Sequence, residues 1–242
     1  MLRTLLVYTV VILFIVILGV PMILWSAITG NSDALYAVGL FGARTAFRLA
    51  GVKIIVSGRE KIPAGRAVVF MPNHQSNCDP PAVAANLPPV LVMAKQEFFQ
   101  IPILGTAIRM RGFIPVDRKN RERAFAAVDQ AIAALKAGHS FLVFPEGTRS
   151  RDGRLQPFKS GVFVMAIKAG APIVPVSVSG GSRIIRKGEF RIHPGTLRMT
   201  LHDPVPTDGC SITDRDKVAQ QVRRAVIAGL TPEERPLESG SD

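Results

Sequence analysis

Residues that make disulfide frameworks or stack on nucleobases are scarce in this chain. Among 242 residues there are two cysteines, one tryptophan and two tyrosines. The two cysteines, Cys78 and Cys210, do not make a disulfide framework and fit a reducing compartment. With so few side chains to stack on bases, and with neither zinc-finger spacing nor an aromatic ribonucleoprotein signature, the sequence argues against nucleic acid as a partner.

Acidic residues are also in short supply. The chain has 18 Asp and Glu against 30 Lys and Arg, which gives a formal net charge of +12, while 48% of its residues are hydrophobic. Basic charge combined with high apolar content suits a protein that rests on an anionic membrane surface better than a freely soluble one. We therefore expect an anionic phospholipid membrane as a partner.

Charge of either sign is absent from the 29 residues numbered 4–32, a stretch rich in Val, Ile and Leu. A continuous helix of that length would measure ~43 Å, which exceeds the ~30 Å core of a bilayer. Pro21 and Gly30 would also allow a kinked or re-entrant hairpin with residues 34–50 as its second arm. Residues 1–50 are therefore predicted to form a membrane-anchoring helix or helical hairpin, and the spanning and re-entrant forms both stay open.

A cleaved signal peptide is the alternative for this stretch, with Arg3 as its basic N-terminal region. The apolar run is longer than the usual core of such a peptide, ~7–15 residues, and no clear small-x-small cleavage site follows it. Basic residues come soon after the run, which by the positive-inside rule places the rest of the chain in the cytoplasm. They are Arg44, Arg48, Lys53, Arg59 and Lys61.

From about residue 51 the chain alternates strand-like and helix-like segments without repeats, low-complexity tracts or a linker. The alternation predicts one α/β domain over residues 51–230, with a mixed sheet flanked by helices. A solvated C-terminal tail is expected over residues 231–242, with the acidic residues Glu233, Glu234, Glu238 and Asp242. Strands are expected at residues 52–56, 67–71, 90–93, 113–116, 140–144, 173–178, 190–193 and 197–202. Helices are expected at residues 80–86, 121–137, 162–169 and 214–228.

The helix expected after Asn120 has the clearest pattern. Gly138 follows it as a stop signal. Four apolar residues recur at helical spacing and are expected to face the core. They are Phe125, Val128, Ile132 and Leu135.

A histidine and an aspartate stand five positions apart in the run Asn-His-Gln-Ser-Asn-Cys-Asp-Pro at residues 73–80. The run joins an expected strand to an expected helix, which Asp79 would cap and Pro80 would begin. Residues five apart on one helix are rotated by about 140°, so His74 is expected on the loop, with its ring folded back onto Asp79. Such a carboxylate would fix the tautomer and stabilise the imidazolium, and the pair could deprotonate a hydroxyl. The structural alternative is that Asp79 only caps its helix and His74 bonds to the backbone.

Three further segments place glycine, proline or a cation at the end of an expected strand. They are Gly-Phe-Ile-Pro-Val-Asp-Arg at residues 112–118, Phe-Pro-Glu-Gly-Thr-Arg-Ser at 144–150 and Ile-Val-Pro-Val at 173–176. The proline of the last favours an edge strand or a bulge. In this order and spacing the four segments resemble the four blocks of the glycerolipid acyltransferase family.

This resemblance implies acyl transfer onto a lipid hydroxyl. His74 would be the general base and Asp79 would orient it, while the hydroxyl attacks an acyl thioester directly. The implied reaction moves a fatty acyl group from acyl-CoA or acyl carrier protein to the sn-2 hydroxyl of 1-acylglycerol-3-phosphate (lysophosphatidic acid), giving phosphatidic acid. The implied location is the cytoplasmic face of a bacterial inner membrane.

The acceptor of that reaction carries a phosphate monoester. By resemblance Arg118 and Arg149 would bind it, because a guanidinium can grip phosphate oxygens bidentately. Gly147 and Thr148 would add a backbone amide and a hydroxyl. Glu146 has two open roles, a hydrogen bond to the glycerol or a contact that holds an arginine. In so basic a chain, either arginine could instead be solvated or touch a lipid headgroup.

No acyl-enzyme nucleophile, metal or cofactor is expected. The sequence has no Gly-x-Ser-x-Gly elbow, and Cys78 has no evident base, so packing is its expected role. The four histidines show no zinc-ligand spacing, and neither a phosphate loop nor a dinucleotide fingerprint is present. The thioester donor would bring its own activation.

Three other functions stay open. The same transfer could use another lysolipid acceptor, such as a lyso-ornithine lipid or another lysophospholipid. A non-catalytic protein could use the basic surface to bind anionic lipid. A lipid hydrolase could use His74 and Asp79 and would release fatty acid without any acceptor.

Overall fold

One mixed sheet forms the centre of the protein. Within residues 1–117 and 120–237, the part of the chain that the computed structural model describes, seven strands pair in the order β1-β7-β6-β2-β5-β3-β4. All neighbouring strands run parallel except β6 and β7, which are antiparallel. The strands are β1 (Val52–Ser57), β2 (Val69–Pro72), β3 (Val90–Lys95), β4 (Ile114–Val116), β5 (Ser140–Leu142), β6 (Ile173–Ser179) and β7 (Gly195–Leu201). The single mixed-sheet fold expected from the sequence is confirmed.

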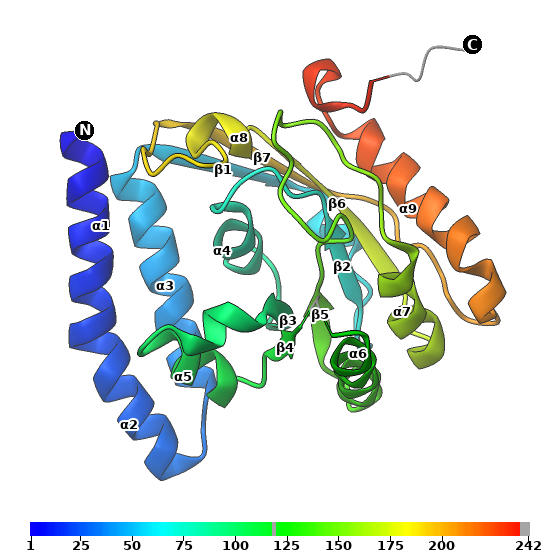
Figure 1. Ribbon diagram of the computed structural model, residues 1–242, viewed down its shortest axis with the longest axis horizontal. Coiled ribbons are helices and arrows are strands. Elements are labelled where there is room, and N and C mark those ends of the chain that lie inside the picture. The colour runs from blue at the N-terminus through cyan, green and yellow to red at the C-terminus, as the bar shows by residue number, and fades with distance from the viewer. Residues whose placement is uncertain (118–119, 238–242) are drawn as a thin grey trace.

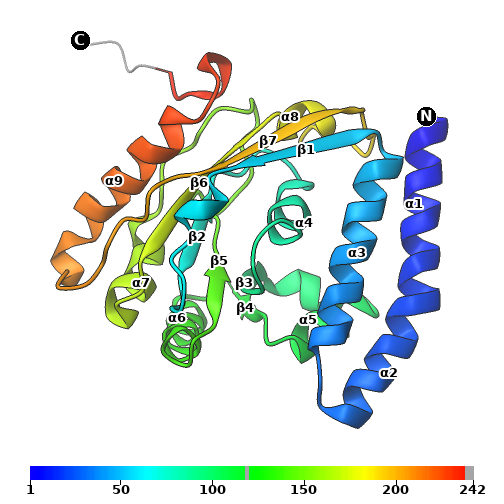
Figure 2. The ribbon, with the colours of Figure 1, turned by 180° about the vertical axis from the view of Figure 1, so that it is seen from behind.

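Helices cover both faces of this sheet (Figures 1 and 2). They are α3 (Asp33–Leu49), α4 (Asp79–Ala84), α5 (Leu104–Met110), α6 (Arg121–Lys136), α7 (Phe163–Ala169), α8 (Gly181–Ile184) and α9 (Arg215–Ala228). Short 3-10 turns link them at η2 (Arg59–Lys61), η3 (Gln96–Gln100), η4 (Ser160–Val162), η5 (Ile212–Asp214) and η6 (Pro232–Glu234). The four helices and seven of the eight strands expected from the sequence form within two residues of their predicted ends.

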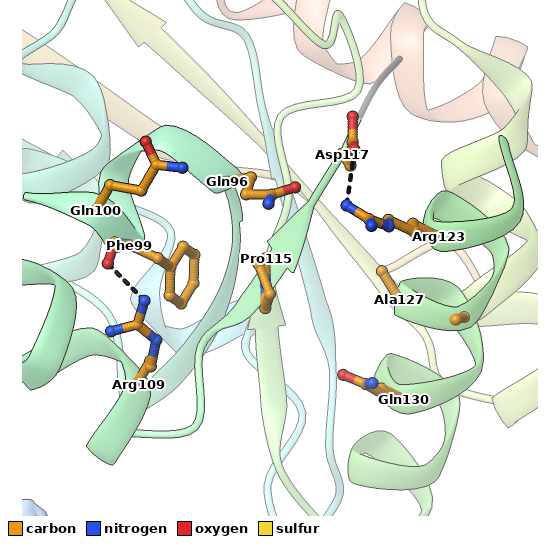
Figure 3. A pocket seen from close by; sticks show the side chains of 10 residues that line it. Gln96, Phe99, Gln100, Arg109, Pro115, Asp117, Arg123, Ala127 and Gln130 are labelled. Carbon is orange, nitrogen blue, oxygen red and sulfur yellow. Dashed lines mark hydrogen bonds and ion pairs between the residues drawn. The ribbon is translucent and has the colours of Figure 1, made fainter. Parts of the chain in front are cut away.

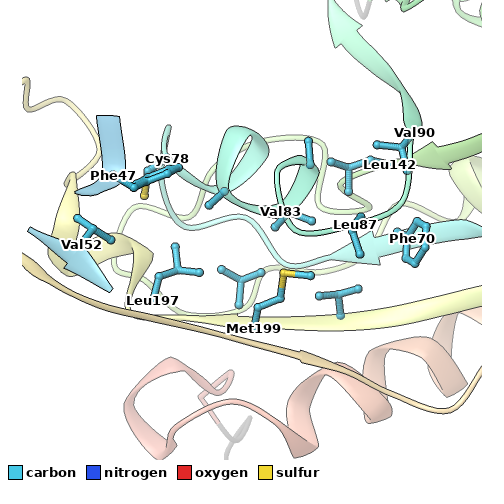
Figure 4. Close-up of a cluster of buried hydrophobic side chains, with 14 of the residues drawn as sticks. Phe47, Val52, Phe70, Cys78, Val83, Leu87, Val90, Leu142, Leu197 and Met199 are labelled. Atoms are coloured by element: carbon cyan, nitrogen blue, oxygen red, sulfur yellow. The ribbon is translucent and has the colours of Figure 1, made fainter. Parts of the chain in front are cut away.

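Alternate residues of β2 supply the two cores. Phe70 packs with α3, α4 and the strands on one face (Figure 4). Val69 and Met71 pack with α6, α7 and α9 on the other face. Because central strands are buried on both sides, they appear in the sequence as continuous apolar runs, and this is why they could be located there.

The N-terminal region is a helical hairpin. The apolar helix Leu2–Thr29 is long and apolar enough to cross a membrane, and only 6% of its apolar 18-residue stretch is buried inside the protein. It consists of α1 (Leu2–Phe14), the π turn η1 (Ile15–Gly19) and α2 (Val20–Thr29). It ends at Gly30, whose φ of +70° lies in the left-handed region. The chain then returns as α3 beside α1, where the Phe14 ring occupies the space that a Cβ at Gly42 would need. The sequence predicted either a membrane-anchoring helix or a helical hairpin for residues 1–50, and the structure has the hairpin.

Pro175 lies in β6, a central strand, so the prediction of an edge strand is wrong. The predicted bulge is found opposite it: Ile173 pairs with Val205 and Val176 with Leu201, which sets five residues of the partner segment against four of β6. Antiparallel pairing of β6 with β7 begins at Val176. The carbonyl of Pro175 accepts the N–H of His202, which follows β7. The missing proline N–H therefore lies opposite this irregular pairing, where a proline inside a sheet is tolerated.

Two predictions made from the pattern of apolar residues are wrong. Residues 190–193 form a loop, not a strand, and its backbone bonds to α1. Phe125 is 57% exposed, although its spacing predicted a core position. The inward stripe of α6 instead runs through the small residues Ala127 and Ala131, which let the helix lie close to the sheet and α7.

The predicted solvated tail is also wrong at its start. Glu234 is buried, with 4% of its surface exposed. Its carboxylate accepts the N–H of Gly180 at 2.8 Å, and its carbonyl accepts the N–H of Leu155 at 2.9 Å. The chain is therefore attached to the domain through Glu234, while Glu238 and Asp242 lie outside the described residues.

A buried polar cluster attaches the end of α9 to the sheet. Ser177 Oγ lies 2.6 Å from His202 Nε2 and donates to the carbonyl of Val226 at 2.7 Å. A Cβ at Gly229 would lie 2.5 Å from Ser177 Oγ and 2.9 Å from His202 Nε2. Gly229 has φ −93°, an ordinary value for any residue, so it is the lack of space that requires glycine.

Gly229→Ala should therefore destabilise the fold by about 1–3 kcal/mol through overpacking. In thermal unfolding of the detergent-solubilised protein, this corresponds to a loss of roughly 3–10 °C in Tm. Gly161→Ala is the matched control, because a Cβ at Gly161 would meet nothing within 4 Å. Equal Tm values for the two variants would contradict the close contact.

Candidate active site

The histidine and the aspartate meet at the carboxyl edge of the sheet. His74 leaves β2 on a loop, and Asp79 is the first residue of α4, one residue further into the helix than predicted, with Cys78 at the cap position. His74 Nδ1 lies 3.1 Å from Asp79 Oδ2. This contact fixes the Nδ1–H tautomer and leaves Nε2 as the nitrogen that can accept a proton.

Asp79 is completely buried, and backbone donors hold its charge. Oδ2 accepts the N–H groups of Gln75 and Ser76, each at 2.6 Å, besides the contact with His74. A Cβ at Gly181, the first residue of α8, would overlap Asp79 Oδ1. A buried carboxylate needs such donors, because desolvation of an unpaired charge is costly.

Several contacts fix the position of His74. Its ring lies over Phe144, with ring centroids 4.3 Å apart, and 16% of its side-chain surface is exposed. Its N–H donates to Glu146 Oε1 at 2.5 Å, and its carbonyl accepts the N–H of Ser150 at 2.8 Å. Just before it, Asn73 is fully buried and exchanges two hydrogen bonds with the backbone of Val178 in β6. The loop is thus held by β6 and by the segment that follows β5, as well as by β2.

Glu146 has an unusual environment. Only 3% of its surface is exposed, and its two oxygens accept the N–H groups of His74 and Gln156. Burial raises the pKa of Glu146 to about 7, against the lowering effect of these two hydrogen bonds. The sequence left open a contact with glycerol or with an arginine, whereas the contacts observed here connect Glu146 to the backbone of the His74 loop.

Gly147, Thr148 and Arg149 continue from Glu146 around a tight turn. Gly147 has φ +68° and donates its N–H to the carbonyl of Phe144. Thr148 is exposed, Arg149 is half-buried, and the carbonyl of Arg149 accepts a hydrogen bond from Lys187 Nζ at 2.6 Å. The turn thereby presents a hydroxyl and a guanidinium beside the His74 loop, which is suitable for an anionic group.

Arg118, the phosphate ligand expected from the second block, lies outside the described residues. Asp117, which precedes it, lines a pocket of about 510 Å³ over β4, between η3 and α5 on one side and α6 on the other (Figure 3). There Arg123 lies 3.6 Å from Asp117, and Arg109 donates to the carbonyl of Phe99 at 2.7 Å. The second block therefore borders a pocket of mixed polar and apolar lining over β4, the last strand of the sheet.

Cys78 is adjacent to the pair but chemically unsuited to act. It is 4% exposed and belongs to the core cluster around Phe70. Burial and the neighbouring charge of Asp79 raise the pKa of its thiol to about 12. A thiol with such a pKa is not a nucleophile near neutral pH, and its surroundings agree with the packing role expected from the sequence.

The family can now be stated. Residues 53–179 match the family model described as Acyltransferase, and this chain belongs to the acyltransferase family. It is 32% identical over 219 residues to human 1-acyl-sn-glycerol-3-phosphate acyltransferase alpha, covering 89% of this chain and 76% of that protein. It is also 32% identical over 183 residues to a 1-acyl-sn-glycerol-3-phosphate acyltransferase of Chlamydomonas reinhardtii. That match covers 75% of this chain but 54% of the relative, so the chain spans about half the length of this algal protein.

A solved structure is similar over nearly the whole chain. The crystal structure of the 1-acyl-sn-glycerophosphate acyltransferase PlsC from Thermotoga maritima superposes with a TM-score of 0.79 and 32% identity. The match covers 93% of each chain. The family expected from four short sequence blocks is therefore confirmed, and the similarity extends to the N-terminal hairpin.

Sequence reasoning missed three residues that position the site. Asn73, Gln75 and Ser76 are all buried and polar, and they stood in the quoted run without an assigned role. Ser76 Oγ donates to the carbonyl of Ile185, and Gln75 Nε2 donates to that of Gly153. A cluster of small polar residues directly after a buried strand was the available signal, since such groups need partners once buried.

Glu146 makes stability depend on pH. Its pKa of about 7 in the folded state exceeds the ordinary value of 4.5, so the folded protein binds this proton more tightly than the unfolded chain. Its contribution to the free energy of unfolding therefore falls as pH rises from about 4.5 to 7, by up to about 3 kcal/mol. Glu146→Gln carries no such proton, so between pH 5 and 8 the variant should gain stability relative to the wild type. A stability difference that stays constant or moves the other way would contradict this.

Proposed function

We propose that this protein transfers a fatty acyl group from a thioester, acyl-CoA or acyl carrier protein, to the sn-2 hydroxyl of 1-acylglycerol-3-phosphate. The products are phosphatidic acid and the free thiol. One observation carries the proposal: a buried carboxylate holds a partly exposed imidazole at the edge of the sheet. The similarity to 1-acylglycerol-3-phosphate acyltransferases supports the substrate assignment.

In the proposed mechanism, the oxygen of the acceptor hydroxyl attacks the thioester carbonyl while His74 Nε2 takes the proton of that hydroxyl. The C–O bond forms, and the carbonyl electrons move to oxygen to give a tetrahedral intermediate. When the intermediate collapses, the C–S bond breaks and the thiolate takes the proton back from the imidazolium. Asp79 stabilises the imidazolium between these two steps and keeps the ring oriented. No acyl-enzyme is formed, which agrees with the raised pKa of Cys78.

The acceptor's phosphate would bind to the turn after Glu146. Arg149 and Arg118 would supply charge and Thr148 would supply a hydroxyl. The N–H of Gly147, expected from the sequence as a phosphate donor, is donated to the carbonyl of Phe144, so Gly147 would shape the turn instead. Glu146 would act through the backbone of the His74 loop, as a positioning residue and not as a ligand of the glycerol. No cofactor takes part, because the thioester is already activated.

The apolar hairpin would hold the enzyme on the membrane that contains its lipid substrate. The outward side chains of the helix Leu2–Thr29 are exposed in the protein alone, including Leu5, Ile17 and Ile28. With basic residues following the hairpin, the domain would lie on the cytoplasmic face of a bacterial inner membrane. Anionic phospholipid would be its immediate surroundings.

Thiol release by the purified, detergent-solubilised protein tests the proposal. With acyl-CoA and 1-acylglycerol-3-phosphate, His74→Ala should reduce release by about 10²–10⁴-fold, because general base catalysis contributes that much. Cys78→Ala is the control and should stay within about threefold of the wild type, because its thiol takes no part. Phosphatidic acid should be the lipid product.

Other outcomes distinguish the alternatives. Thiol release without any acceptor would indicate a hydrolase, and equal rates with a lysolipid that lacks the phosphate monoester would overturn the acceptor. Full activity of His74→Ala would remove the base from the mechanism.

A further inference from the structure

The loop between α8 and β7, residues 185–194, is not used by the mechanism above. Phe190 in this loop is 82% exposed. Residues 183–191 hold four basic residues, Arg183, Arg186, Lys187 and Arg191, against the single acidic residue Glu189. An isolated exposed phenylalanine needs no explanation, but one within a basic segment has the composition of a membrane-interface element.

The backbone of the loop is attached to the first turns of α1. The N–H of Ile192 donates to Thr4 Oγ1 at 3.1 Å, and the hydroxyl of Tyr8 donates to the carbonyl of Phe190 at 3.0 Å. In Figures 1 and 2 the loop after α8 meets the N-terminal end of the hairpin. There Leu2 and Leu5 are 84% and 66% exposed. The backbone of Phe190 is thus held beside the first turns of the anchor, and its largely exposed ring contributes little to the core.

The positive charge lies on the same loop. Arg186 and Arg191 are exposed on the loop, and Arg186 has an acidic partner there, Glu189 at 3.8 Å. Arg183, in α8, is also exposed, but its charge acts on Glu233. Near an anionic bilayer each basic side chain changes partitioning by roughly fivefold. Arg191 lies between Phe190 and Ile192, the two residues bonded to α1, and is placed for a headgroup phosphate where the anchor meets the domain.

We infer that residues 185–194 form a second membrane contact, in which Phe190 enters the interfacial layer of an anionic bilayer and Arg191 binds headgroup phosphate. The bilayer is the one that surrounds the α1–α2 helix. Continuity with that helix and the charge of the loop identify this occupant.

The other end of the loop reaches the candidate active site. The carbonyl of Ile185 accepts the hydroxyl of Ser76, next to His74, and Lys187 Nζ donates to the carbonyl of Arg149. If the protein has the proposed function, the bond between Lys187 and Arg149 places the acceptor's phosphate site next to a membrane-bound loop. A lysolipid could then enter from the bilayer surface without first dissolving in water.

Tryptophan fluorescence in vesicles tests the contact. The only native tryptophan, Trp25, is first removed by Trp25→Phe, and Phe190→Trp then reports on the loop alone. The full chain is placed in vesicles that contain brominated phosphatidylcholine and phosphatidylglycerol. We expect at least twofold stronger quenching at position 190 than in the matched control, Phe125→Trp on α6, which replaces another exposed phenylalanine on the opposite side of the sheet from α3.

Charge reversal tests the headgroup part of the inference. Adding Arg191→Glu should reduce the quenching at position 190, and so should replacing phosphatidylglycerol with neutral lipid. Equal quenching at positions 190 and 125 would overturn the membrane contact, and indifference to both charge changes would overturn the anionic headgroup as partner. Because no turnover is measured, either failure would leave the proposed acyl transfer intact.

Discussion

A single carboxylate oxygen organises the candidate active site. Asp79 Oδ2 accepts hydrogen bonds from His74 Nδ1 and from the N–H groups of Gln75 and Ser76. Because Asp79 is fully buried, its charge is stable only with these donors, so the turn and the carboxylate hold each other in place. The same contacts direct one nitrogen of His74 to the carboxylate and leave the other for a substrate proton. Both structure and chemistry at this edge therefore depend on Asp79.

The sheet brings distant residues to this carboxylate. Glu146, which follows β5, accepts the His74 N–H across 72 positions of sequence, and Asn73 binds β6 across 105. Parallel strands make this possible because their carboxyl ends meet at one edge. The buried Glu146 has a cost, visible in its raised pKa of about 7. In return the backbone of His74, the proposed base, is held by β2, by β6 and by the segment that follows β5.

The sequence predicted what depends on local pattern. Buried strands appear as apolar runs, and the spacing of His74 and Asp79 placed the histidine on a loop. Contacts between distant segments were out of reach. Periodicity alone could not show that α6 packs through Ala127 and Ala131 while Phe125 faces outward. Likewise, the alternating apolar and basic residues at 190–193 have the same pattern whether they are in a sheet or in a loop, and nothing local connects Glu234 to Gly180.

Replacement of Asp79 by asparagine tests the central claim most directly. The amide keeps the shape but removes the charge that stabilises the imidazolium, and it favours the wrong tautomer of His74. In another protein with an Asp–His pair, such a change lowered kcat by about 10⁴-fold. For Asp79→Asn we predict a loss of about 10³–10⁴-fold in kcat for acyl transfer with KM for the acceptor nearly unchanged. A kcat within tenfold of the wild type, in a folded variant, would contradict the role given to this carboxylate.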